Sequence, residues 1–216
     1  NYLGGCYGSS GPASIDPATG KPYGGTFPPV RTCDVVKSQL ALLDHLEIKQ
    51  LHAVIGASVG GLLAINFATL YPERVKLVVP IASGCRTTVL TRLTLFEQVL
   101  AIENDPHFKG GDYYDGEAPE YGLALARMIS HKTFVHLDAI ERRARQDVKQ
   151  AKGSLSWYKV GHNVESSMLH QGKKVVKRID ASTYLRIADL CLRFDDLRDA
   201  GVKSYKELFA RSKEAG

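Results

Sequence analysis

The chain has 216 residues, of which 44% are hydrophobic and 24% are charged, and its net charge is +5. This composition is typical of globular proteins and excludes a disordered or fibrous chain. The longest apolar runs, such as 75–82, are far shorter than the roughly 20 residues that cross a bilayer, so we predict no membrane partner. The mild positive charge suits an anionic ligand.

The basic residues do not predict a nucleic-acid partner. The densest basic run contains five cations, Arg142, Arg143, Arg145, Lys149 and Lys152. We interpret it as the solvated face of a helix, because it has no interleaved aromatic residues and matches no nucleic-acid-binding module.

The first half of the chain alternates between helix and strand patterns. Residues 1–30 hold seven of the 20 glycines and five of the nine prolines, which predicts a long loop. Asp34 is expected to cap the helix that follows, whose apolar spacing extends to Leu46. Next come a buried strand at 51–55, a helix at 62–70 and a second strand at 75–82. This alternation predicts an α/β fold with a parallel sheet.

Beyond Ser83 the strand pattern stops. Helical patterns follow at 90–103, 121–130, 134–151, 164–170, 181–194 and 205–215. A long, mostly helical stretch after a β/α segment indicates an inserted helical subdomain. We therefore predict a partial α/β core at 1–88, a helical lid at 89–194 and a return toward the core at 195–216.

The residues between the first predicted strand and its following helix carry the clearest chemical signal. The sequence Gly56-Ala57-Ser58-Val59-Gly60 matches the G-x-S-x-G pattern of a nucleophile elbow, in the strand–turn–helix context that the pattern requires. We predict that Ser58 is a nucleophile and that Gly56 and Gly60 let strand and helix approach closely. The Val59 N–H is expected to donate to an oxyanion.

Other interpretations of this segment are less favoured. An ordinary turn rich in glycine and serine would not need both the flanking strand and the flanking helix. A phosphate-binding loop ends in Gly-Lys-Ser or Gly-Lys-Thr, whereas Leu62 and Leu63 follow Gly61 here. A dinucleotide site needs G-x-G-x-x-G, which the segment lacks. We therefore expect no nucleotide-binding loop.

The spacing of cysteine and histidine predicts no metal site. The histidines are scattered, and the cysteines are widely separated at Cys6, Cys33, Cys85 and Cys191. We expect reduced, mostly buried thiols in a cytoplasmic protein. No secretory peptide is recognisable after Asn1, and the missing initial Met indicates a processed or incomplete chain.

A serine nucleophile needs a base and an acid that orients the base. In α/β-hydrolases these follow the serine along the chain, Asp or Glu first and His second. Every histidine after Ser58 falls in the helical region. Asp195, Asp196 and Asp199 are predicted to be surface charges on a helix. We name no catalytic Asp or His, and we expect this chain to stop before the triad is complete and to be inactive alone.

Several motifs in a specific order extend over essentially the whole chain. They are NYLGGCYGSSGP at 1–12, GKPYG at 20–24, GASVGG at 56–61, GGDYY at 110–114, GLALARMI at 122–129, QGK at 171–173 and RIDASTYL at 178–185. With these motifs the sequence resembles the homoserine O-acetyltransferase family. The resemblance implies an α/β-hydrolase fold with an inserted helical lid.

The resemblance implies roles for individual residues. Ser58 would accept an acetyl group from acetyl-CoA and pass it to the hydroxyl of L-homoserine, a ping-pong scheme that feeds methionine synthesis. Arg127 falls on the family arginine that binds the substrate carboxylate; the alternative is a salt bridge within the lid. Phe134 lies two helical turns from Arg127, where many members have a tyrosine, so strict homoserine specificity is left open.

The resemblance also implies partners. These are a second copy of the chain, bound through the lid helices, with acetyl-CoA as acyl-donor substrate and no separate cofactor. L-serine as acceptor and succinyl-CoA as donor remain open. So does a serine esterase, in which water instead of an amino-acid hydroxyl reaches the acyl-enzyme. A non-catalytic fragment is a third possibility.

Overall fold

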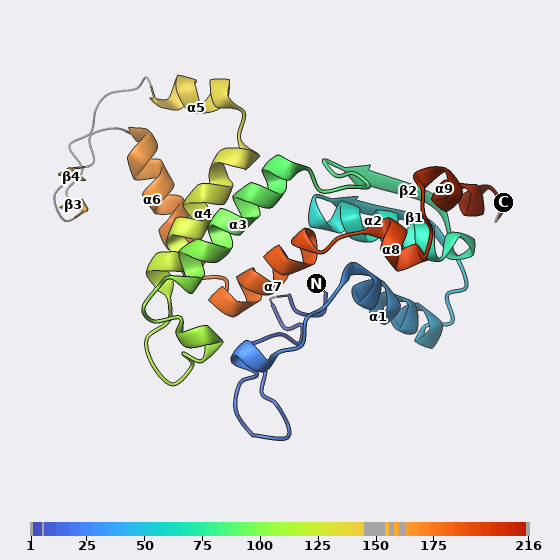
Figure 1. Ribbon diagram of the computed structural model, residues 1–216, viewed down its shortest axis with the longest axis horizontal. Coiled ribbons are helices and arrows are strands. Elements are labelled where there is room, and N and C mark those ends of the chain that lie inside the picture. Colours follow the sequence, from blue (N-terminus) through green and yellow to red (C-terminus); the bar gives the residue numbers. More distant parts are fainter. Residues whose placement is uncertain (1, 6, 145–153, 156–157, 160–162, 215–216) are drawn as a thin grey trace. The chain divides into compact units, whose positions relative to one another are not determined.

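The computed structural model describes residues 2–5, 7–144, 154–155, 158–159 and 163–214 (Figure 1). The chain forms two compact units. One, here called the sheet unit, combines Asn1–Ser9, Pro28–Val89 and Arg186–Gly216; the other, the helical unit, combines Ser10–Phe27 and Leu90–Leu185. The predicted division into a core at 1–88, a lid at 89–194 and a return to the core at 195–216 follows the same order along the chain. It differs because 10–27 belong to the helical unit and 186–194 to the sheet unit.

The sheet unit contains a parallel strand pair joined by a helix. Strand β1 (Leu51–Ala57) pairs with β2 (Val75–Ile81), in a register that runs from Leu51 opposite Val75 to Ala57 opposite Ile81. Helix α2 (Val59–Leu70) and the short turn η2 (Pro72–Arg74) connect them. The predicted strand–helix–strand alternation is confirmed, with α2 beginning three residues earlier than its periodicity indicated.

Three further helices complete this unit. They are α1 (Thr32–His45), α8 (Asp196–Ala200) and α9 (Tyr205–Glu214), and each packs against α2. Asp34 is not the N-cap of α1, as predicted, but its third residue; Arg31 is the N-cap. The Asp34 carboxylate still satisfies the helix end, because its Oδ2 accepts the Arg31 backbone N–H at 3.0 Å.

The core of the sheet unit forms around α2. Phe67 is almost completely buried, as are Val35 and Val36 of α1 and Leu208 of α9. The strands are less buried than predicted: Ile55 exposes 66% of its surface and Leu77 exposes 52%. Within the described part of the chain, α2 packs against both strands, and these apolar side chains are not covered.

The helical unit contains the other predicted helices. Its elements are η1 (Gly24–Thr26), α3 (Val89–Glu103), η3 (Lys109–Gly111), α4 (Glu120–Phe134), α5 (Leu137–Ala144), β3 (Ser154–Leu155), β4 (Tyr158–Lys159) and α6 (Asn163–Val176). Helix α7 (Ala181–Leu192) begins in this unit and ends in the sheet unit. A buried cluster that includes Ile102, Leu123 and Ala126 joins α3 to α4, and Val175 of α6 belongs to it.

Two sequence predictions for this unit need correction. The antiparallel pair of β3 and β4 lies between the helices predicted at 134–151 and 164–170, in a part of the chain where no strand was predicted. The helix predicted at 134–151 begins three residues later, as α5 at Leu137, because Phe134 is the last residue of α4 and Val135 is extended. Its part beyond Ala144 lies outside the described residues, as do Arg145, Lys149 and Lys152 of the basic run. Among the helices that the structure describes, none has both the length and the apolar character needed to cross a bilayer.

Candidate active site

Ser58 occupies a sharp turn between the last residue of β1 and the first residue of α2. Its backbone has φ 52° and ψ −118°, a conformation that residues other than glycine rarely adopt. The Ser58 N–H donates to the Ile81 carbonyl oxygen at 2.9 Å, and the Ser58 carbonyl accepts from Gly61 N–H at 2.9 Å. The backbone is thus held on both sides of the turn, while the Ser58 side chain is exposed.

The turn requires glycine at two positions, and one differs from the prediction. A Cβ added to Gly56 would lie 2.0 Å from the Gly60 carbonyl oxygen, and one added to Gly61 would lie 2.4 Å from Ser83 Cβ. A Cβ on Gly60 would meet nothing within 4 Å. The prediction was therefore right for Gly56 and wrong for Gly60. Gly60 contributes its carbonyl group, which leaves no room for a side chain on Gly56. Gly61 is the second residue that permits the close approach.

The Val59 N–H lies at the start of α2. The first amides of a helix have no partner within the helix, and the helix dipole makes that end partly positive. This placement suits the predicted oxyanion donor. Ser83 Oγ, beyond the end of β2, is buried without a hydrogen-bond partner among the described residues, and it lies beside the first turn of α2. Sequence reasoning missed Ser83, although its place just after the second parallel strand was a usable signal.

Arg127 lies on α4 of the helical unit, with Phe134 two turns further along. The Arg127 Cζ atom is 5.2 Å from the centroid of the Phe134 ring, which places the guanidinium over the ring face. Arg127 Nε is buried and has no hydrogen-bond partner among the described residues. The alternative of a salt bridge within the lid finds no support, because no ion pair in the described chain involves Arg127.

The family comparison decides the fold class. A family model described as the alpha/beta hydrolase fold matches residues 1–170. This chain belongs to the α/β-hydrolase fold family. The turn at Ser58 has the strand–turn–helix form that a nucleophile elbow takes in this fold.

Sequence relatives of this α/β-hydrolase include homoserine acyltransferases. It is 38% identical over 216 residues to a homoserine O-acetyltransferase of Solidesulfovibrio magneticus, covering 99% of this chain and 54% of the relative. It is 43% identical over 202 residues to a homoserine O-succinyltransferase of Halorhodospira halophila, covering 92% of this chain and 52% of the relative. The chain spans about half the length of the curated relatives it matches.

Solved structures give the same fold. The homoserine O-acetyltransferase of Bacillus anthracis superposes with a TM-score of 0.83 at 26% identity, over 94% of this chain and 53% of that one. Esterase E22 superposes with a TM-score of 0.82 at 27% identity, over 96% of this chain and 58% of that one. The same α/β-hydrolase scaffold therefore occurs in an acyltransferase and in an esterase.

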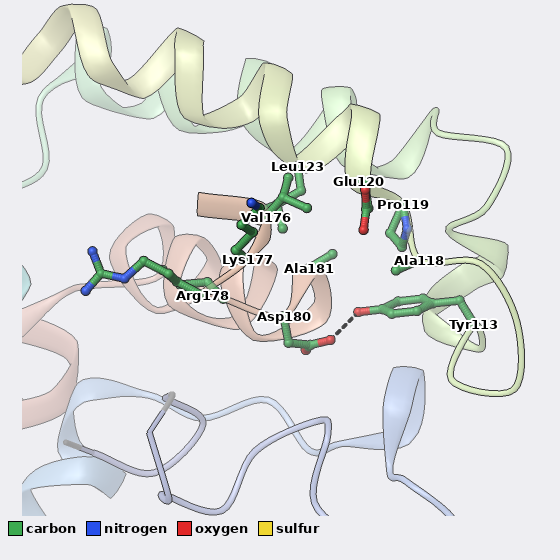
Figure 2. Close-up of a pocket in the computed structure, with 11 residues that line it drawn as sticks. Tyr113, Ala118, Pro119, Glu120, Leu123, Val176, Lys177, Arg178, Asp180 and Ala181 are labelled. Atoms are coloured by element: carbon green, nitrogen blue, oxygen red, sulfur yellow. Dashed lines mark hydrogen bonds between the residues drawn. The ribbon is translucent and has the colours of Figure 1, made fainter. Parts of the chain in front are cut away.

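A cavity of about 260 Å³ in the helical unit contains neither Ser58 nor Arg127 in its wall (Figure 2). The start of α4, the end of α6 and the start of α7 line it. Two of its polar groups bind each other: Tyr113 donates to Asp180 Oδ1 at 2.5 Å, and burial raises the pKa of Tyr113 to about 12. We do not take this cavity as the active site, because these groups are occupied in holding the loop before α4 onto α7.

The structure assigns no partner that activates Ser58 in the described residues. Ser58 Oγ makes no hydrogen bond to any of them, and His162 lies outside them. Ser58 belongs to the sheet unit and Arg127 to the helical unit. Of the predicted surface carboxylates only Asp195 is exposed; Asp196 and the Asp199 side chain are fully buried, which corrects that prediction. In the described ranges, no three ligating side chains gather in a way that could hold a metal ion.

Proposed function

We propose that this α/β-hydrolase transfers an acetyl group from acetyl-CoA to the hydroxyl of L-homoserine. The observation that carries the proposal is the Ser58 elbow, with its strained backbone, in a chain about 40% identical to homoserine acyltransferases over nearly all its length. A strained serine at the start of a helix is arranged for nucleophilic attack on an acyl carbon.

In the proposed reaction, Ser58 Oγ attacks the thioester carbon of acetyl-CoA. The carbon–sulfur bond breaks, the serine proton passes to the coenzyme A thiolate through a base, and an acetyl ester remains on Ser58. The Val59 N–H donates to the carbonyl oxygen while it carries negative charge. The homoserine hydroxyl then attacks the acetyl-Ser58 carbon, which restores the serine and releases O-acetylhomoserine.

Arg127 is proposed to bind the carboxylate of homoserine. Its buried Nε lacks a protein acceptor, and a guanidinium can hold a carboxylate through two parallel hydrogen bonds. The face of the Phe134 ring packs against the guanidinium. Tyr184 lies near Arg127: burial raises the pKa of Tyr184, and the positive charge of Arg127 opposes that rise. The Tyr184 hydroxyl donates to Gln98 Oε1 at 2.5 Å.

A serine esterase is the second candidate. Esterase E22 matches this chain as well as the Bacillus anthracis acetyltransferase does, so the scaffold supports either outcome. The two differ in whether homoserine or water deacylates Ser58. The buried Arg127 Nε, which lacks a partner among the described residues, favours transfer, because hydrolysis needs no carboxylate-binding group. Among the relatives, both O-acetyltransferases and O-succinyltransferases are named, so succinyl-CoA is the alternative donor.

The second copy of the chain and the cytoplasmic location are proposals as well. Helix α3 exposes large apolar side chains, among them Leu90 at 74%, Leu93 at 55% and Phe96 at 53%, which supports an association through the lid helices. Cys33, Cys85 and Cys191 are unpaired, which supports a reducing compartment. Cys6 lies outside the described residues.

The deciding experiment follows the acyl group. The protein that carries this chain is incubated with acetyl-CoA, with and without homoserine, and O-acetylhomoserine and free acetate are measured. Transfer predicts that homoserine diverts most of the acetyl group from acetate to O-acetylhomoserine. Acetate as the main product at saturating homoserine supports the esterase instead. Succinyl-CoA, as a competing donor, tests the acyl specificity.

A further inference from the structure

Asn66 and Asp196 form a buried polar pair in the sheet unit that the proposed chemistry does not use. Both residues are 0% exposed, and they lie on α2 and α8, which are side by side (Figure 1). Asn66 Nδ2 donates to Asp196 Oδ1 at 2.8 Å, across 130 residues of sequence. This hydrogen bond connects α2, the helix that follows Ser58, to the segment that returns after the helical unit.

One oxygen atom in each of the two side chains has no partner. Asn66 Oδ1 and Asp196 Oδ2 are both buried without a hydrogen bond among the described residues. Both are acceptors if Asp196 is ionised, so neither can satisfy the other. Leaving a buried acceptor unpaired costs about 1–3 kcal/mol, and more if it is charged.

A single proton gives both unpaired oxygen atoms a hydrogen-bond partner. A protonated carboxyl has one O–H donor and a carbonyl acceptor, and the asparagine amide has a carbonyl acceptor and two N–H donors, so the two groups can pair through two antiparallel hydrogen bonds. We propose that Asp196 takes up a proton on Oδ2 and donates it to Asn66 Oδ1, closing a neutral acid–amide pair that binds α8 to α2. The ligand of this site is the proton itself.

The surroundings of Asp196 favour its neutral form. Burial raises the pKa of Asp196 from 3.8 to about 6; the Asn66 hydrogen bond opposes this, and the nearby charges of Asp199 and Asp195 add to it. Cys85, beyond β2, and Tyr205 of α9 are the other titratable groups that interact with Asp196, and neither is a cation. Two arginines lie against Asp199, with Arg31 Nη1 at 3.8 Å and Arg198 Nε at 3.6 Å from its Oδ1. Arg86 acts on Tyr205.

The direction of the pH effect follows from the raised pKa. Because the folded state binds the Asp196 proton more tightly than the unfolded state, the contribution to stability is complete below about pH 4. It is lost as the pH rises through about 6. The difference of about two pKa units corresponds to about a hundredfold change in the folding equilibrium constant.

The test compares the pH dependence of unfolding in two variants of the full chain. Asp196→Asn gives a side chain that is always neutral and can form the same two hydrogen bonds, so its unfolding free energy should lack the loss between pH 4 and pH 7. Asp195→Asn is the matched control, because Asp195 is exposed and asparagine preserves its capping of α8. It should retain most of the loss, because the Asp195 charge is the smallest of the causes that raise the pKa of Asp196. Equal pH dependence in wild type and Asp196→Asn overturns the proposal.

A direct measurement covers the case in which Asp196→Asn does not fold. The carbon-13 resonance of the Asp196 carboxyl is titrated in the wild-type chain, together with the nitrogen-15 resonance of the Asn66 side-chain amide. We expect both to move with one midpoint near pH 6. A midpoint near pH 4 for Asp196, or an Asn66 amide that does not respond, overturns the proposal. Neither resonance depends on acyl transfer, so this outcome is separate from that of the proposed function.

Discussion

The Ser58 N–H donates to the Ile81 carbonyl oxygen at 2.9 Å, so the turn after β1 is tied to the end of the neighbouring strand. This bond continues the parallel pairing of the two strands by one residue beyond Ala57 opposite Ile81. The unfavourable backbone at Ser58 is thereby sustained by sheet and helix together. The elbow is a property of the whole β1–α2–β2 arrangement, not of five residues alone.

Replacement of Ser58 tests the nucleophile. With Ser58→Ala we expect kcat to fall by about 10⁴-fold or more, since loss of the attacking group leaves only binding and oxyanion stabilisation. The measurement is turnover, with trapping of radiolabelled acetyl-enzyme from acetyl-CoA. Label retained on the Ser58→Ala protein would show that another residue is acylated. Folding of the variant is checked by circular dichroism.

The two glycines before and after Ser58 give a matched pair of stability predictions. Gly56→Ala places a methyl group 2.0 Å from the Gly60 carbonyl, and we expect it to destabilise the sheet unit by about 3 kcal/mol. Gly60→Ala meets open space in a helix, so we expect a change within about 1 kcal/mol, toward higher stability. Urea denaturation measures both. Similar losses in the two variants would contradict the role assigned to the Gly60 carbonyl.

Arg127→Lys retains the positive charge but loses the planar fork of the guanidinium. We expect KM for homoserine to rise by about tenfold or more while KM for acetyl-CoA stays nearly constant. Steady-state kinetics with each substrate varied in turn measures the difference. An equal rise in both KM values, or none, would indicate that Arg127 acts in lid structure rather than in acceptor binding.

Phe134 offers a finer test of the same site. Phe134→Leu removes the aromatic face under Arg127, which is worth about 0.5–1 kcal/mol at an exposed position, so KM for homoserine should rise by about two- to fivefold. Phe134→Tyr keeps the face and adds a hydroxyl, and should leave that KM equal or lower. The idea fails if leucine and tyrosine at this position behave alike.

The sequence predicted the local structure of the elbow well, because that structure is determined by neighbouring residues. The apolar runs of β1 and β2 and the small residues around Ser58 identify a strand–turn–helix unit without reference to the rest of the chain. The choice of Gly60 instead of Gly61 was wrong, because it depends on which side of the first helical turn faces Ser83.

Buried polar groups were not predictable in the same way. Asp196 and Asp199 look like surface charges because their partners lie far away in sequence: Asn66 for Asp196, and Thr32, whose hydroxyl donates to Asp199 Oδ2 at 3.2 Å. A single sequence contains no periodic signal for a pairing over 130 residues or more. The burial of Arg127 Nε likewise depends on packing within the helical unit, which residue spacing on α4 does not reveal.

The sheet unit takes its residues from three separate stretches, with nearly all of the helical unit made between the second and the third. During synthesis, α2 leaves the ribosome more than a hundred residues before α8 and α9, the helices that later pack on it. Contacts of such long sequence separation form slowly. Until then the Asn66 amide and the apolar surface of α2 around Phe67 lack part of their native cover. This interval, rather than any property of the finished fold, is when the chain is most exposed to aggregation.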